Sequence, residues 1–150
     1  MAQHPPSDRL PAWPPRHPAY RAVAPLSPAD ARLWSVFAHL GGTFLSLLAP
    51  LGIWVGFKDR DPFVRRHASQ ALNFHLTLLV AMIAFLPLYL GAIVAAGATE
   101  NPAFMLAAVL VALPVGLALG VTVLVCTVMA AVAANAGRDY RYPATIPFVR

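Results

Sequence analysis

The amino-acid sequence predicts an all-α integral membrane protein, built as a small bundle of three transmembrane helices behind a disordered tail. Composition is the first indication, because 59% of the 150 residues are hydrophobic and 11% are charged. Soluble domains carry about 25% charged residues, and the mean hydropathy of +0.64 is correspondingly high. Three apolar runs without a formal charge, at about 33–57, 74–97 and 103–134, are each long enough to cross a hydrocarbon core of roughly 30 Å.

Residues 1–26 form a separate segment, which contains seven prolines mixed with arginines and histidines and has no apolar periodicity. Such a segment buries too little surface to offset the entropy of ordering the chain, so we expect a disordered tail. It lacks the apolar core of a signal peptide. The helical membrane domain is then expected to occupy residues 27–150.

The first helix is predicted to begin at Ser27, an N-cap residue, with Pro28 at the first helical position. The run 33–57 would measure about 37 Å as one helix, enough for a single tilted crossing. Gly41–Gly42 and Pro50 interrupt it, however, and a proline inside a helix removes a backbone hydrogen bond. The first span is therefore expected to be kinked at Pro50, with a re-entrant pair of half-helices as the alternative.

The second helix is predicted to follow a charged turn, with Asp61 as its N-cap and Pro62 as its first residue. Polar side chains then recur every four residues, which places them in one stripe on the helix just before the apolar run. They are Arg65, Ser69, Asn73 and Thr77. A third helix is expected to begin at Pro102 and to end near Ala134.

Basic residues set the expected orientation in the membrane. With three crossings, the central loop and the C-terminal tail share one side and carry seven Lys and Arg residues, against four in the N-terminal tail. The loop between the second and third helices has none. By the positive-inside rule the central loop and the C-terminus lie in the cytoplasm, and the expected location is the bacterial inner membrane. A re-entrant first run would place all eleven basic residues on the cytoplasmic side.

The chemistry of the apolar runs argues against several classes of function. They contain no Asp, Glu, Lys or Arg, whereas pumps and coupled transporters place such residues inside the membrane. Basic residues flank these runs as in membrane loops, so nucleic-acid binding is not expected. The single cysteine, Cys126, permits no intrachain disulfide or thiolate cluster. His67 and His75 have poor ligand spacing, and His39 is expected to bond a neighbouring helix, so no metal or other cofactor is predicted.

No enzymatic activity is predicted either. His39 and Ser46 are seven residues apart and can share a helix face, but no nucleophile-elbow pattern accompanies them. Two G-x-x-x-G pairs instead indicate close helix packing in lipid, within the chain, between copies, or with other membrane proteins. These pairs are Gly52 with Gly56 and Gly116 with Gly120.

Two motifs resemble those of a known family. The segment His67–Phe74 has the pattern H-A-x-x-A-L-N-F, and Tyr140–Pro143 has the pattern Y-x-Y-P. From Trp34 to the C-terminus, the chain resembles a family of small bacterial membrane proteins that are named as similar to the Tic-twenty component of the chloroplast import translocon. The resemblance implies a multi-pass membrane protein with a link to protein translocation.

The sequence therefore predicts a non-enzymatic membrane protein that acts through protein or lipid contacts in a membrane assembly. The contact surface is expected at the start of the second helix and in the C-terminal tail, where polar and aromatic residues flank the membrane. Its residues are Arg65, Arg66, His67, Gln70, Asn73, Tyr140 and Tyr142. The alternative is an oligomeric channel or facilitator for small solutes, whose pore would be lined by His39, Ser46 and Asn73.

Overall fold

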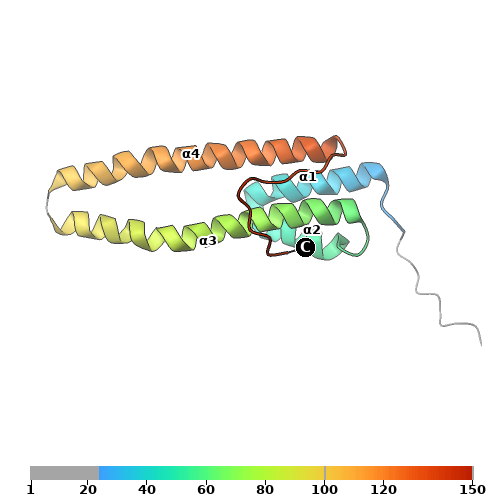
Figure 1. The fold of residues 1–150 in the computed structure, drawn as a ribbon, viewed down its shortest axis with the longest axis horizontal. Coiled ribbons are helices and arrows are strands. Elements are labelled where there is room, and N and C mark those ends of the chain that lie inside the picture. The colour runs from blue at the N-terminus through green and yellow to red at the C-terminus, as the bar shows by residue number, and fades with distance from the viewer. Residues whose placement is uncertain (1–23, 100, 150) are drawn as a thin grey trace, which may run out of the picture.

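The structure, a computed structural model, describes residues 24–99 and 101–149. Within these residues the chain forms four helices and no strand. They are α1 (Pro28–Leu45), α2 (Leu48–Phe57), α3 (Pro62–Ala98) and α4 (Pro102–Asn135). Figure 1 shows α3 and α4 as one long hairpin, with α1, α2 and an extended C-terminal segment, residues 138–149, packed around its open end. Nearly all of the predicted tail, residues 1–26, lies outside the described residues.

Capping residues determine where the long helices begin. The hydroxyl of Ser27 accepts a hydrogen bond from the backbone N–H of Asp30 at 3.1 Å, and the carboxylate of Asp61 accepts two from the first turn of α3. A proline follows each cap, and it lacks the N–H that the first helical position leaves unbonded anyway. The predicted helix starts are therefore confirmed at Pro28, Pro62 and Pro102.

The first apolar run does not form the single helix predicted for residues 33–57. The chain reverses between α1 and α2, at Ser46 and Leu47, and Ser46 has a φ of 51°. Pro50 was expected to mark the break, but it lies in the first turn of α2, where a missing backbone N–H costs little. A bundle of three transmembrane helices is therefore not confirmed. With 10 residues, α2 measures about 15 Å, half of a hydrocarbon core.

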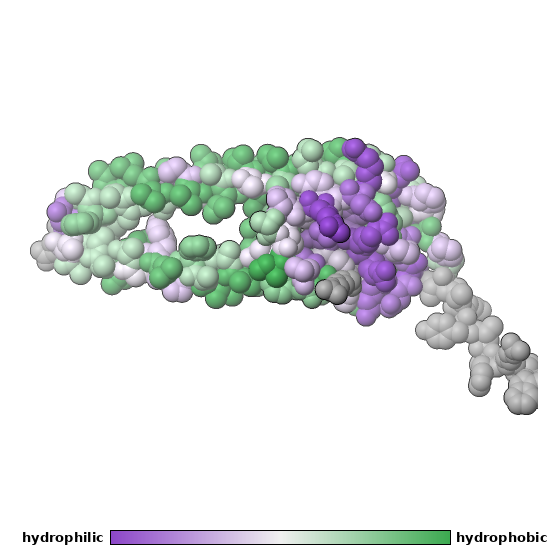
Figure 2. All heavy atoms as spheres, in the orientation of Figure 1, coloured by the Kyte–Doolittle hydropathy of each residue, from purple (hydrophilic) through white to green (hydrophobic). Residues whose placement is uncertain are grey.

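The helices α3 and α4 are long and apolar enough to cross a membrane. They have 37 and 34 residues, about 55 and 51 Å of helix, and they continue through Pro87 and Pro114. Only 0% and 6% of their most apolar stretches is buried inside the molecule, whereas the core helix of a soluble protein is mostly buried. Figure 2 shows this apolar surface along the hairpin and the hydrophilic residues gathered at its open end.

Small residues let the helices pack closely at the open end of the hairpin. The buried cluster there joins α1 to the first turns of α3, and it contains Ala31, Ala38, Val64, Ala68 and Ala71. Further along, Gly42 of α1 lies against the ring of His75 in α3. The helix α1 therefore runs beside α3 in the same direction, and its C-terminal end approaches the apolar part of the hairpin (Figure 1).

Candidate functional site

Among the described residues, basic side chains are confined to one end of the molecule. Residues 67–137, which form most of the hairpin, contain no Lys or Arg. The basic residues that the structure describes are Arg32, Lys58, Arg60, Arg65, Arg66, Arg138 and Arg141, and they belong to segments that meet at the open end (Figures 1 and 2). We refer to this region, residues 24–75 and 126–149, as the polar end.

A pocket of about 310 Å³ lies at the polar end between α3 and the C-terminal segment, and we refer to it as the polar pocket. From α3 it is lined by Arg65, Arg66, His67, Ser69, Gln70 and Asn73, and from the C-terminal segment by Asp139, Tyr140, Arg141, Pro147 and Val149. Six of the seven residues predicted as a contact surface thus line one pocket. The seventh, Tyr142, is buried and stacks on Phe74 with ring centroids 4.1 Å apart.

The side chain of Asn73 fastens the C-terminal segment to α3. Its Oδ1 accepts hydrogen bonds from the backbone N–H groups of Phe148 and Val149, and its Nδ2 donates to the Val149 carbonyl at 2.8 Å. One turn further along α3, the hydroxyl of Thr77 accepts from the N–H of Ile146 at 3.0 Å. These bonds hold the C-terminal segment against one face of α3, and this segment forms the second wall of the pocket.

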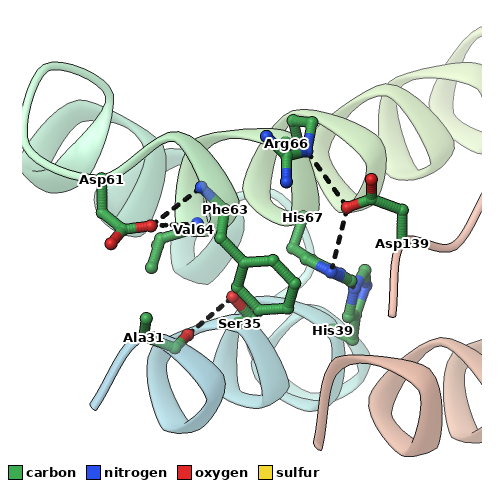
Figure 3. A network of polar contacts seen from close by, with 9 residues as sticks. All are labelled: Ala31, Ser35, His39, Asp61, Phe63, Val64, Arg66, His67 and Asp139. Atoms are coloured by element: carbon green, nitrogen blue, oxygen red, sulfur yellow. Dashed lines mark hydrogen bonds and ion pairs between the residues drawn. The ribbon is translucent and has the colours of Figure 1, made fainter. Parts of the chain in front are cut away.

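A chain of polar contacts leads from the core to the pocket. The Tyr142 hydroxyl lies 2.9 Å from Nδ1 of His39, and Nε2 of His39 lies 2.9 Å from Nδ1 of His67. Nε2 of His67 then faces Oδ1 of Asp139 at 3.9 Å, and Arg66 Nε donates to the same oxygen at 3.0 Å. Figure 3 shows how His39 of α1 and His67 of α3 meet beneath this surface ion pair.

The positions of the protons in this series of contacts follow from the groups at its two ends, Tyr142 and Asp139. Burial raises the pKa of the Tyr142 phenol, which therefore keeps a proton that it can donate to Nδ1 of His39. A neutral imidazole has one N–H, so His39 donates through Nε2 to His67, and His67 carries its own proton on Nε2. That N–H faces the carboxylate of Asp139, whereas the opposite arrangement would turn a lone pair toward a negative charge. All donors therefore point from the core toward the pocket.

The expectation that His39 bonds a neighbouring helix is confirmed, because its partner His67 lies on α3. Sequence reasoning missed Asp139 and Arg141 of the pocket. At the end of α4, Gly137 adopts a φ of 70°, which turns the chain back so that Asp139 pairs with Arg66 across a separation of 73 residues. The available signal was the glycine stop followed directly by charged residues.

The three residues considered for a pore do not share a cavity. Asn73 lines the polar pocket, which neither His39 nor Ser46 lines. His39 is 0% exposed in the core, while Ser46 is exposed at the turn between α1 and α2. The ring of His75 bonds the Ala71 carbonyl of its own helix at 2.8 Å.

The two G-x-x-x-G pairs lie where no other described part of the chain approaches. A Cβ added at any of these glycines would meet nothing within 4 Å, and this holds for Gly52, Gly56, Gly116 and Gly120. Packing within the described chain therefore does not explain them. The glycines at a close approach are instead Gly41, against Ala49 of α2, and Gly42, against His75 of α3.

A protein-family model matches most of the chain. It is MamF/MmsF, described as the magnetosome magnetite crystal formation protein family, and it matches residues 30–149. The matched range includes the hairpin, the histidine pair and the polar pocket. No curated protein and no solved structure matches the chain.

The predicted resemblance to the Tic-twenty-like family was wrong, because the model that matches these residues describes a different family. Both motifs that led to it, His67–Phe74 and Tyr140–Pro143, lie inside the matched range. The structure gives them a packing role, since their side chains join α1, α3 and the C-terminal segment through hydrogen bonds. Motifs of this kind are explained by the packing of segments, and a shared packing arrangement does not identify a family.

Proposed function

The chain belongs to the magnetosome magnetite crystal formation protein family, MamF/MmsF, and from this premise we propose that it is a non-enzymatic membrane protein of magnetosomes. It takes part in magnetite crystal formation through contacts of the polar pocket, at its polar end, with other proteins or with lipids. The observation that carries this proposal is the polar pocket, which gathers three arginines next to an apolar hairpin of membrane-crossing length. Partners at the membrane surface would meet the chain there.

The buried polar side chains bond one another across packed segments, which supports a role without catalysis. His39 bonds His67 and Tyr142, and neither histidine bonds a serine, threonine or cysteine side chain among the described residues. Asp139, the acidic residue of the pocket, is paired with Arg66 at the surface. These groups serve to hold α1, α3 and the C-terminal segment together.

In the proposed topology, α3 and α4 cross the membrane, while α1 and α2 enter it only from the polar side. The apolar stretch 78–97 of α3 measures about 30 Å, one hydrocarbon thickness. At the turn between α1 and α2, Phe44 and Leu48 are 85% and 71% exposed, which suits a re-entrant tip in lipid. All basic residues then share one side, which the positive-inside rule assigns to the cytoplasm.

Single-cysteine labelling tests this topology. In a Cys126→Ser background, Ala29→Cys, Asp59→Cys and Thr99→Cys each place a thiol at an exposed position. With the chain in the plasma membrane of an expression host, an impermeant maleimide added to intact cells is expected to label only Thr99→Cys. Permeabilised cells should label all three. Labelling of Ala29→Cys in intact cells would instead establish three crossings.

Complementation of a magnetosome-forming host that lacks its own family member tests the function. Arg65→Gln/Arg66→Gln is expected to give fewer or smaller magnetite crystals than the unchanged chain, seen by electron microscopy, and to lose co-purifying proteins or lipids. The control, Lys58→Gln/Arg60→Gln, removes the same charge from residues that do not line the pocket. Crystals that are equally normal, or equally impaired, in both variants would contradict the proposal.

The unpacked glycine pairs provide a second contact surface, on the apolar part of the molecule. Small residues let helix backbones approach closely in lipid, and Gly116 and Gly120 lie on the exposed hairpin. We propose that these pairs contact another membrane protein or a second copy of the chain, in the same assembly that the polar end serves.

A further inference from the structure

The polar pocket has an excess of positive charge. Three arginines line it, Arg65, Arg66 and Arg141, together with one acidic residue, Asp139. Only Arg66 is within ion-pair distance of Asp139, at 3.0 Å, and no acidic group of the described residues lies within that distance of the other two arginines. Two positive charges therefore face the pocket without a counter-charge from the described part of the chain.

Two residues that line the pocket also carry a buried polar atom without a hydrogen bond among the described residues. Nε2 of His67 and the hydroxyl of Ser69 form no hydrogen bond there, although these residues are only 1% and 6% exposed. The proton order of the His39–His67 pair puts an N–H on that nitrogen, and Asp139 at 3.9 Å is too far to accept it. Buried polar groups almost always have partners. The Arg138 backbone lies close to His67, so the Ser69 hydroxyl is the group that needs an acceptor in the pocket.

We propose that the polar pocket binds a phosphate oxyanion. One of its oxygens would accept a hydrogen bond from Ser69, which shares a face of α3 with Arg65, while Arg65 and Arg141 balance its charge, an arrangement that arginine favours for phosphate. At about 310 Å³ the pocket falls at the lower end of small-molecule sites and has room for more than a bare anion. The bound group is therefore expected to be a phosphate ester.

Two sources supply this chemistry, a phospholipid headgroup and a soluble phosphate. If the hydrocarbon core ends near Leu78, Asn73 lies about 8 Å outside it, at the outer edge of a headgroup layer roughly 5–8 Å deep. A lipid phosphate can then reach the pocket from the membrane surface. The lipid source rests on the proposed membrane function, whereas binding of a soluble phosphate does not.

Binding is measured on the full chain in nanodiscs, with two probes. The first is phosphatidic acid at a low fraction in phosphatidylcholine, counted by native mass spectrometry, and the second is inorganic phosphate, titrated by calorimetry in phosphatidylcholine alone. Arg65→Gln/Arg141→Gln and Ser69→Ala are each expected to weaken binding by at least about tenfold. Lys58→Gln/Arg60→Gln should bind as the unchanged chain does. Ser69→Ala replaces an unpaired hydroxyl and is expected to keep the fold intact.

Each result decides the proposal. Retention of phosphatidic acid that Ser69→Ala abolishes supports a lipid ligand, and a response to inorganic phosphate alone supports a soluble one. If neither probe binds, the proposal is overturned, because water alone then fills the pocket. Binding that falls with Lys58→Gln/Arg60→Gln as much as with the pocket variants overturns it too, since it reflects general charge. Normal crystal formation by a variant that has lost phosphate would contradict the proposed function and leave this site standing.

Discussion

Replacing His39 with leucine is expected to lower the free energy of unfolding of the polar end by roughly 2–6 kcal/mol. Leucine has a similar bulk but no ring nitrogens, so the Tyr142 hydroxyl loses its acceptor and Nδ1 of His67 loses its donor. Each buried group left unpaired costs about 1–3 kcal/mol. Because His39 is 0% exposed, water cannot take the place of the lost partner without opening the core.

Cys126 provides the measurement, since it is the single thiol of the chain and is 9% exposed in the cluster that contains Tyr142. Its labelling rate in the purified protein reports the free energy of opening that cluster. Ser35→Ala is the matched control, because Ser35 is equally buried on the same helix but bonds the Ala31 carbonyl of its own helix at 2.7 Å. Its effect should stay below about 1.5 kcal/mol.

A double-mutant cycle measures how much the hydrogen bond between His39 and Tyr142 contributes to stability, apart from simple packing. In Tyr142→Phe the phenol that His39→Leu would leave unpaired is already absent, so the combined loss should be smaller than the sum by about 1–3 kcal/mol. Strictly additive losses would show that the bond between the Tyr142 hydroxyl and His39 contributes nothing to stability. The tautomer order that leaves the Nε2 proton of His67 facing the pocket would then lose its support.

Features that depend on neighbouring residues could be predicted from the sequence. Ser27 and Asp61 cap their helices through bonds to residues two or three positions away, so the starts of α1 and α3 were found. The polar stripe of α3 follows from helical spacing alone, and three of its four members, Arg65, Ser69 and Asn73, line the pocket. What their side chains contact was not predictable, because Asn73 bonds Val149 at a separation of 76 residues.

The reversal between α1 and α2 could not be placed from the sequence for a different reason. The run 33–57 is apolar throughout, so hydropathy alone does not distinguish one crossing from two shorter helices. The residues that suggested a break, Gly41–Gly42 and Pro50, all lie within helices, and the turn falls at Ser46 and Leu47. Gly41 and Gly42 allow another helix to approach closely. Which helix packs there depends on the tertiary fold, which hydropathy does not reveal.

The second large expected effect on stability is at Gly42, which packs closely against His75. A Cβ at this position would overlap Cε1 of His75 and lie 2.9 Å from its Nε2. The ring is buried and its Nδ1 bonds the Ala71 carbonyl at 2.8 Å, so it cannot turn aside without losing that bond. Gly42→Ala is therefore expected to push α1 away from α3 and to lower the free energy of unfolding by about 1–3 kcal/mol.

The matched control is Gly91→Ala on the hairpin, where an added methyl group meets nothing within 4 Å. There alanine only improves helix propensity, so stability should stay unchanged or rise by up to about 1 kcal/mol. The two variants make the same chemical change with opposite expected signs, and thermal unfolding in detergent followed by circular dichroism compares them. A Gly42→Ala protein as stable as the unchanged chain would mean that α1 does not pack on α3 at His75. The helices α1 and α2 would then not be held against α3, and the case for a re-entrant element would lose its structural basis.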